Sequence, residues 1–222
     1  MTGGGRTLCR VRIRTGTSVN VYPFLLQRCQ FHRQHLMAVQ PWPKVGAPRL
    51  IGSARNRSLV RQDFLVHGQH VEEFVLHVTD QSSVLVFPVT RDLRVIAIEL
   101  FRPGANKVLI ELPGGNIESD AERLDKARVV KRELVEETGY YTDTVIPLFQ
   151  DEVWFDPSVF DAKFYPFLAL NCAKQCDVAE HEVRSVDLKT WFEMCFNGQV
   201  TDGKTLSTTL LAQPHLSQFM HP

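Results

Sequence analysis

Three glutamates close together in the sequence are the residues whose types and spacing are best suited to chemistry. Glu133, Glu136 and Glu137 stand at positions i, i+3 and i+4, which places their side chains on one face of a helix. Like charges this close repel one another and need a positive partner. Arg132 can pair with one carboxylate, and a hard divalent cation such as Mg²⁺ can neutralise the others. Gly139 follows where helices often end in a left-handed residue.

A glycine-rich segment before this helix offers a further oxygen ligand. Residues 112–115, Leu-Pro-Gly-Gly, lead out of an expected strand into a loop. Glycine lets the backbone approach a ligand closely, so the carbonyl oxygen of Gly114 can point at a cation. Alone, an E-x-x-E-E run is more often a solvated acidic face. Together with the glycine loop (residues 112–115) it predicts a site of hard oxygen ligands for Mg²⁺, with Mn²⁺ as a possible substitute.

These two segments resemble the Nudix hydrolase signature, G-x5-E-x7-R-E-U-x-E-E-x-G-U, in which U is a bulky apolar residue. Gly115 matches the first glycine, and residues 132–140 match the second half completely. The first half departs from the pattern, because the signature glutamate would fall at Ala121 and the arginine comes three residues late. Glu118 and Glu122 are the nearest candidates for that glutamate. A three-residue insertion where the loop meets the helix accounts for the difference.

The flanking sequence resembles the ADP-ribose pyrophosphatase branch of that family. Arg102 ends an expected strand and matches an arginine that contacts substrate phosphate, and the resemblance also places Glu111 and Gly115 at the substrate. Glu180-His181-Glu182 resembles the acidic loop of that branch. The resemblance implies that Glu180 is the base and that Glu182 is a further metal ligand.

Two more segments extend the resemblance over about residues 60–213. Residues 156–160 occupy the place of a Ser-Pro-Gly loop but lack its glycine. Residues 198–205 are similar to a closing Gly-x-Ile-x-Asp segment.

The resemblance implies Mg²⁺-dependent hydrolysis of a nucleoside diphosphate sugar, with ADP-ribose giving AMP and ribose 5-phosphate. Glu133, Glu136 and Glu137 would hold the metal. Glu180, Glu137 and Arg132 would form the catalytic set. Two alternatives stay open: a pyrophosphohydrolase of RNA 5′ ends, and a non-catalytic Nudix-fold module that binds nucleotide or RNA within a complex.

The order of expected elements predicts an α/β (α+β) fold, which the resemblance specifies as a Nudix-like α/β/α sandwich with a mixed sheet and a small N-terminal β unit. A hairpin is expected within residues 63–78, and strands at 84–89, 94–101, 109–112, 143–150, 154–155, 163–170 and 183–188. Helices are expected at 120–138, 188–196 and 203–213. We divide the chain into a basic leader or disordered arm (1–48), a small β dimerisation unit (49–80) and a Nudix hydrolase domain (81–222). By resemblance the protein is a homodimer.

The formal net charge of zero hides a strong asymmetry along the chain. Residues 1–62 contain 11 Lys and Arg and no Asp or Glu, which leaves 14 bases against 25 acids, a net charge of −11, for the rest. An Arg-rich, acid-free N-terminus is typical of a transit peptide for mitochondria or another organelle. A disordered arm on a cytoplasmic protein and an arm that contacts RNA are the alternatives.

Cysteine usage and hydropathy bound the remaining possibilities. The five cysteines are odd in number and lack a disulfide-framework spacing, which indicates a reducing compartment. No apolar stretch approaches the roughly 20 residues that a membrane span needs.

Overall fold

The central strand of the larger sheet is the longest continuously buried stretch of the chain. In this computed structural model, which describes residues 40–220, β4 (Ser82–Thr90) is buried from Val84 onward. It pairs in parallel with β10 (Lys163–Lys174) and antiparallel with β5 (Arg94–Arg102). A strand buried on both faces reads as an unbroken apolar run, which is why residues 84–89 predicted it.

The remaining strands of this sheet extend outward from β5 and β10. β6 and β11 pair with β5, and β7, β8 and β9 pair with β10. Their bounds are β6 (Lys107–Glu111), β7 (Tyr140–Tyr141), β8 (Thr144–Pro147), β9 (Val153–Trp154) and β11 (Glu182–Asp187). The helices are α1 (Asp120–Leu124), α2 (Lys126–Thr138), α3 (Leu188–Phe196) and α4 (Gly203–Met220).

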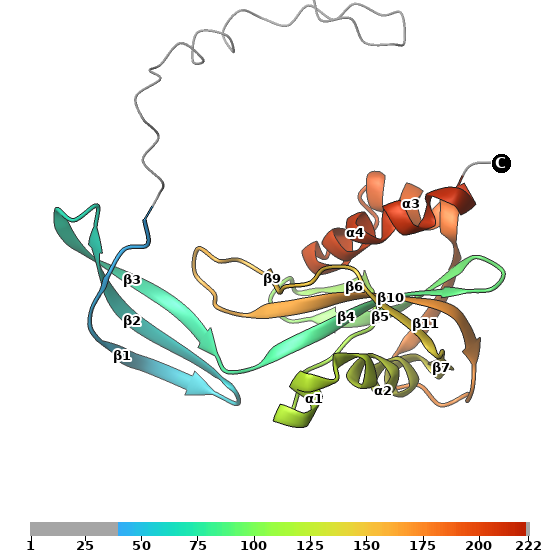
Figure 1. Ribbon diagram of the computed structural model, residues 1–222, viewed down its shortest axis with the longest axis horizontal. Coiled ribbons are helices and arrows are strands. Elements are labelled where there is room, and N and C mark those ends of the chain that lie inside the picture. Colours follow the sequence, from blue (N-terminus) through green and yellow to red (C-terminus); the bar gives the residue numbers. More distant parts are fainter. Residues whose placement is uncertain (1–39, 221–222) are drawn as a thin grey trace, which may run out of the picture. The chain divides into compact units, whose positions relative to one another are not determined.

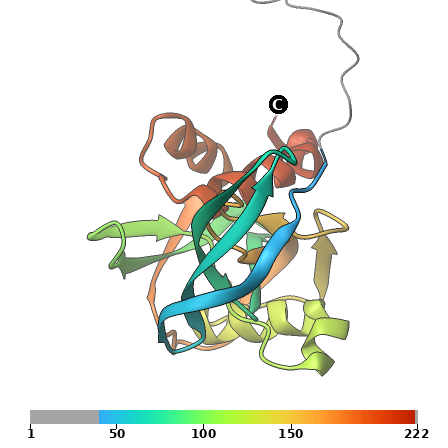
Figure 2. The same cartoon turned by 90° about the vertical axis from the view of Figure 1, so that its left-hand side faces the viewer.

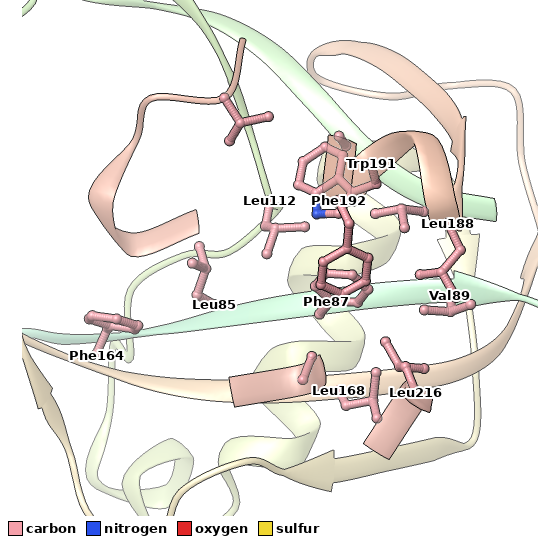
Figure 3. Close-up of a cluster of buried hydrophobic side chains, with 14 residues drawn as sticks. Leu85, Phe87, Val89, Leu112, Phe164, Leu168, Leu188, Trp191, Phe192 and Leu216 are labelled. Atoms are coloured by element: carbon pink, nitrogen blue, oxygen red, sulfur yellow. The ribbon is translucent and has the colours of Figure 1, made fainter. Parts of the chain in front are cut away.

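Helices cover both faces of this mixed sheet, with α2 on one side and α3 and α4 on the other (Figure 1). Side chains of β4 alternate between the two resulting cores. Val84 and Val86 pack with α2 residues, whereas Phe87 packs beneath Trp191 and Phe192 of α3 (Figure 3). Trp191 is fully buried, and its indole N–H donates to the Thr209 hydroxyl at 3.1 Å. The predicted α/β/α sandwich is confirmed.

A second, three-stranded antiparallel sheet precedes the larger one (Figure 2). We call β1 (Lys44–Ala54), β2 (Arg57–Val66) and β3 (His70–Thr79) the small sheet. The hairpin expected within residues 63–78 is present, but our boundary at residue 48 is wrong because it falls inside β1. Pro48 is tolerated there since β1 is an edge strand whose register shifts between Val45 and Arg49. Residues 1–39, which hold most of the predicted leader, lie outside the described part.

The single helix expected over residues 120–138 is interrupted at Asp125. This residue ends α1, and its carboxylate accepts a hydrogen bond from the Arg128 N–H at 3.1 Å at the start of α2. Ser119 caps α1 in the same way, accepting from the Glu122 N–H at 3.3 Å. Asp favours caps over helix interiors, because its side chain competes for backbone N–H groups. The apolar periodicity alone did not reveal this break.

The C-terminal helices confirm one boundary and extend another. α3 spans the residues predicted for it, whereas α4 continues to Met220, beyond the expected end at residue 213. The residue before a proline is disfavoured in helices, yet α4 passes through Pro214. None of the helices among residues 40–220 is long and apolar enough to cross a membrane.

Candidate active site

The glycine loop, α2 and the end of β5 surround a cavity of about 500 Å³. The cavity gathers most residues that the sequence singled out for chemistry. Those that line it are Arg102, Gly114, Gly115, Arg132, Glu133, Glu136, Glu137 and Glu180.

The glycine loop binds one of the three carboxylates through its backbone and packs closely against a second. The N–H of Gly114 donates to Glu137 at 2.7 Å. A Cβ at Gly115 would lie only 2.1 Å from the carboxyl carbon of Glu133, so this carboxylate occupies the space that any other residue would fill. Gly114 itself packs on β4, where a Cβ would meet the carbonyl oxygen of Val84 at 2.3 Å. Both positions therefore exclude a side chain because other protein atoms approach closely, whereas the approach to a ligand stays a prediction.

Burial strongly disfavours the charged forms of two glutamates. Burial raises the pKa of Glu133 to about 7; nearby Arg132 lowers it, and the charges of Glu137 and Glu136 raise it further. Burial also raises the pKa of Glu137 to about 7; the Gly114 N–H lowers it, and the charge of Glu180 raises it. Carboxylates crowded in this way favour a bound cation.

Arg132 lies among the carboxylates. Its guanidinium is 2.8 Å from Glu133 and 3.0 Å from Glu136, and it also donates to the carbonyl oxygen of Asn116 at 3.3 Å. These contacts connect the acidic face of α2 with the chain leaving the glycine loop. Arg132 therefore acts on geometry and charge balance within the site.

Glu122, one of the two candidates for the displaced signature glutamate, lies between the chain after the glycine loop and α2. Its carboxylate accepts a hydrogen bond from the Glu118 N–H at 2.6 Å and lies 3.4 Å from Arg132. Because α1 places Glu122 within reach of both, its carboxylate connects the loop at Glu118 to Arg132 of α2. The sequence had left Glu118 and Glu122 as equal candidates.

A buried carboxylate fixes the cations on the opposite side of the cavity. Glu111 is fully buried and accepts two hydrogen bonds from Arg102, at 2.7 and 2.8 Å. The ammonium of Lys204 lies 3.7 Å from the same carboxylate. Glu111 thus orients Arg102 but does not itself line the cavity, whereas Arg102 and Lys204 do.

The acidic loop is only partly assembled at this site. The backbone N–H of Glu180 donates to the Glu136 carbonyl at 3.1 Å, and Glu180 lines the cavity. His181 stands 3.4 Å from Glu137. Glu182 is exposed on β11, pairs in register with Glu99, and does not line the cavity. The structure therefore brings Glu180 to the other carboxylates but not Glu182.

Several cavity residues were missed by the sequence reasoning. Asn56 and Arg57 come from the small sheet, and Lys204 comes from the first turn of α4. Arg57 stacks its guanidinium over the ring of Phe160, 5.6 Å from its centroid. The sequence did not indicate that these residues line the cavity, because strand pairing and helix docking bring them to it.

The oxygen atoms at this site are of the kind that a hard divalent cation prefers, but the three carboxylates are paired with other groups of the protein. Within residues 40–220 no group of three His, Cys, Asp or Glu side chains is arranged to hold a metal. Glu137 accepts from Gly114, while Glu133 and Glu136 both contact Arg132. Among the same residues, the Gly114 carbonyl oxygen accepts no hydrogen bond. Carboxylate and carbonyl oxygens are the ligands that Mg²⁺ prefers, so the residues would fit such an ion once Arg132 releases Glu133 and Glu136.

Comparison with known proteins supports the fold. No protein-family model and no curated protein matches the sequence. Among solved structures, the chain is similar to a crystal structure of an ADP compounds hydrolase, with a TM-score of 0.69 and 16% sequence identity. The similarity covers 82% of this chain and 98% of that one. At this identity it shows that the chain shares the α/β/α fold over nearly the whole length of that hydrolase.

Proposed function

We propose that the protein is a Nudix-type hydrolase that cleaves the diphosphate of a nucleoside diphosphate sugar, with ADP-ribose as the favoured substrate. One observation carries the proposal: a single cavity joins the carboxylates of α2, the glycine loop that grips them, and the guanidinium of Arg102. The similarity in fold to an ADP compounds hydrolase supports it.

The metal would be Mg²⁺, held by Glu133, Glu136 and Glu137 with the carbonyl oxygen of Gly114. When bound, it would neutralise phosphate charge and orient the attacking water. We do not include Glu182 among the proposed metal ligands, because it does not line the cavity.

The chain's own residues account for the rest of the reaction. Glu180 stands at the cavity with an exposed side chain, where it can take a proton from water. The water oxygen then bonds to one phosphorus, and the bond from that phosphorus to the bridging oxygen breaks. ADP-ribose and water give AMP and ribose 5-phosphate. Arg102, oriented by Glu111, would bind a phosphate oxygen with its planar fork.

The partner we propose is a second copy of the chain. Three apolar side chains stand side by side on one face of the small sheet: Val60 of β2, which is 8% exposed, lies opposite Leu50 of β1 and Leu76 of β3. Leu50 is 66% exposed, so this face is incompletely covered within one chain. Two copies joined through it would bury that area. Targeting to an organelle, and contact with RNA through the basic arm, stay predictions because the arm lies outside the described residues.

In the decisive experiment, the purified protein is incubated with Mg²⁺ and, separately, with each candidate substrate. The candidates are ADP-ribose, other nucleoside diphosphate sugars and 5′-triphosphate RNA. We expect turnover of ADP-ribose, with AMP and ribose 5-phosphate resolved by ion-exchange chromatography. Turnover of RNA alone would favour the RNA 5′-end activity. Tight nucleotide binding without turnover of any substrate would favour a binding module.

A further inference from the structure

Lys204 is a cation at the cavity to which the sequence assigned no role. It lies in the first turn of α4, its side chain is 23% exposed, and it lines the cavity together with Arg102 and Glu137. It also lines a neighbouring cavity of about 330 Å³ with Phe155 and Asp202. Lys204 therefore stands where the two hollows meet.

The residue is positioned by rigid neighbours. The hydroxyl of Thr205 accepts a hydrogen bond from the Leu112 N–H at 3.1 Å, and the Thr205 N–H donates to Asp202 at 2.8 Å. These bonds attach the start of α4 to the first residue of the glycine loop. The backbone of Lys204 is thus fixed relative to the carboxylate site, as preorganised binding requires.

Charge around Glu111 is not balanced one to one. Arg102 takes both oxygens of this buried carboxylate in a bidentate pair. The Lys204 ammonium lies 3.7 Å away, too far for a hydrogen bond. Within the described residues its Nζ has no hydrogen-bond partner, although it lies 5.4 Å from the centroid of the Phe155 ring. Arg102 and Lys204 therefore both lie beside Glu111, and their charges also act on Glu137. The Lys204 ammonium, which has no hydrogen-bond partner among the described residues, lines the cavity.

We propose that Lys204 binds a phosphate oxygen of the diphosphate, beside Arg102. The inference rests on the proposed function for the identity of the substrate, and it adds a specificity residue to that site. Arg102 supplies a planar fork and Lys204 a compact charge with three donors, so together they can hold adjacent phosphate oxygens. The two cations suit a ligand carrying at least two negative charges close together.

The test uses the full-length protein at fixed Mg²⁺, with inorganic diphosphate as the binding probe and ADP-ribose as the substrate. Lys204→Met and Lys204→Gln remove the charge, and Lys204→Arg keeps it. Lys189→Met is the matched control, because Lys189 is exposed on α3 and lines neither cavity. Calorimetry gives Kd for diphosphate, steady-state kinetics give KM and kcat, and thermal melting reports the fold.

We expect both charge-removing variants to weaken diphosphate binding about tenfold or more, as loss of a charge-assisted hydrogen bond predicts. KM for ADP-ribose should rise in parallel, Lys204→Arg should restore most of the affinity, and melting should stay cooperative. Unchanged Kd in folded Lys204→Met and Lys204→Gln, or no binding of diphosphate by the wild type, would overturn the inference. Binding that depends on Lys204 without wild-type turnover would refute hydrolysis and leave the phosphate contact standing.

Discussion

At the scale of residues, the site holds two carboxyl groups whose ordinary acidity is suppressed. Glu133 and Glu137 each have a pKa of about 7, against an ordinary value of 4.5, mainly because they are buried. Removing either carboxyl group, or placing a cation between them, reduces the electrostatic repulsion between the two carboxylates in the folded state. Stability and the proposed metal binding would therefore be linked through the same side chains.

This linkage predicts how the metal-free protein responds to pH. The folded state binds more protons than the unfolded state between pH 4.5 and about 7, so the free energy of unfolding should fall as pH rises through this window. The contribution is fully present below pH 4.5, and it is on the order of 1–3 kcal/mol per carboxyl. Urea unfolding in EDTA between pH 4.5 and 8 measures it.

The Glu133→Gln variant isolates the effect from other titrating groups. Its unfolding free energy, compared with that of the wild type, should vary less across the same window. Mg²⁺ should raise the melting temperature more at pH 8 than at pH 5, since protons then no longer compete for the carboxylates. Parallel pH curves for the two proteins would contradict the assignment.

Glu137→Gln tests the carboxylate most central to the cavity. We expect hydrolysis of ADP-ribose to fall at least about a hundredfold, because a metal ligand is lost. The fold should persist, since glutamine can still accept from Gly114 through its amide oxygen. Glu193→Gln, on the exposed face of α3, is the control and should keep wild-type activity. Full activity in Glu137→Gln would refute the metal site.

The residue types in the sequence identified the central carboxylates of the site but not all of the residues that line it. Spacing alone placed Glu133, Glu136 and Glu137 together, because a helix fixes the distance between such positions. Lys204 was not found, since its place at the cavity depends on α4 docking against the glycine loop. Glu182 was placed by resemblance, and the structure leaves it outside the cavity.

At the scale of elements, the two glycines of the loop have different roles, one in stability and one in positioning Glu133. Gly114→Ala should destabilise the fold by about 1–3 kcal/mol, because its Cβ would meet backbone atoms of β4 that cannot move aside. Gly115→Ala would meet only the end of the Glu133 side chain, which can swing away. Its loss should appear in activity, about tenfold or more, with a much smaller change in stability. Chemical denaturation and kcat/KM on both variants check this contrast.

The converse result would show that the loop is held differently. If Gly115→Ala were the less stable of the two, Glu133 would have to be fixed in place by more than its contact with Arg132. If both variants kept full activity, close approach at the glycine loop would have no part in positioning the carboxylates.

The periodicity of apolar residues predicted that the strands and helices exist, but it did not predict where helices are interrupted or where elements end. β4 and α3 were predicted within a few residues, because burial and capping signals agree there. Three features were not predicted: the break at Asp125, the strand through Pro48 and the continuation of α4 through Pro214. Asp125 caps within an apparently continuous helix, while the two prolines lie within elements that tolerate them.

At the scale of the whole molecule, the small sheet exposes one apolar face that the homodimer proposal uses. Leu50→Glu should therefore shift the protein toward monomer in analytical ultracentrifugation, because it places charge on that face. Val75→Glu is the matched control: Val75 is 46% exposed but pairs with Arg61, on the other face. A wild-type monomer at micromolar concentration, or equal effects of both variants, would contradict the proposal.

The break between α1 and α2 has a consequence for how the site tolerates change in chain length. Asp125 is exposed and caps α2 with its own side chain, while its backbone N–H donates to the Ala121 carbonyl of α1; the preceding Leu124 is 90% exposed. Insertions at this junction leave the register of the three glutamates untouched, because α2 begins afresh after it. The junction is therefore a natural point for grafting a reporter or epitope beside the cavity, with activity of the inserted chain as the readout.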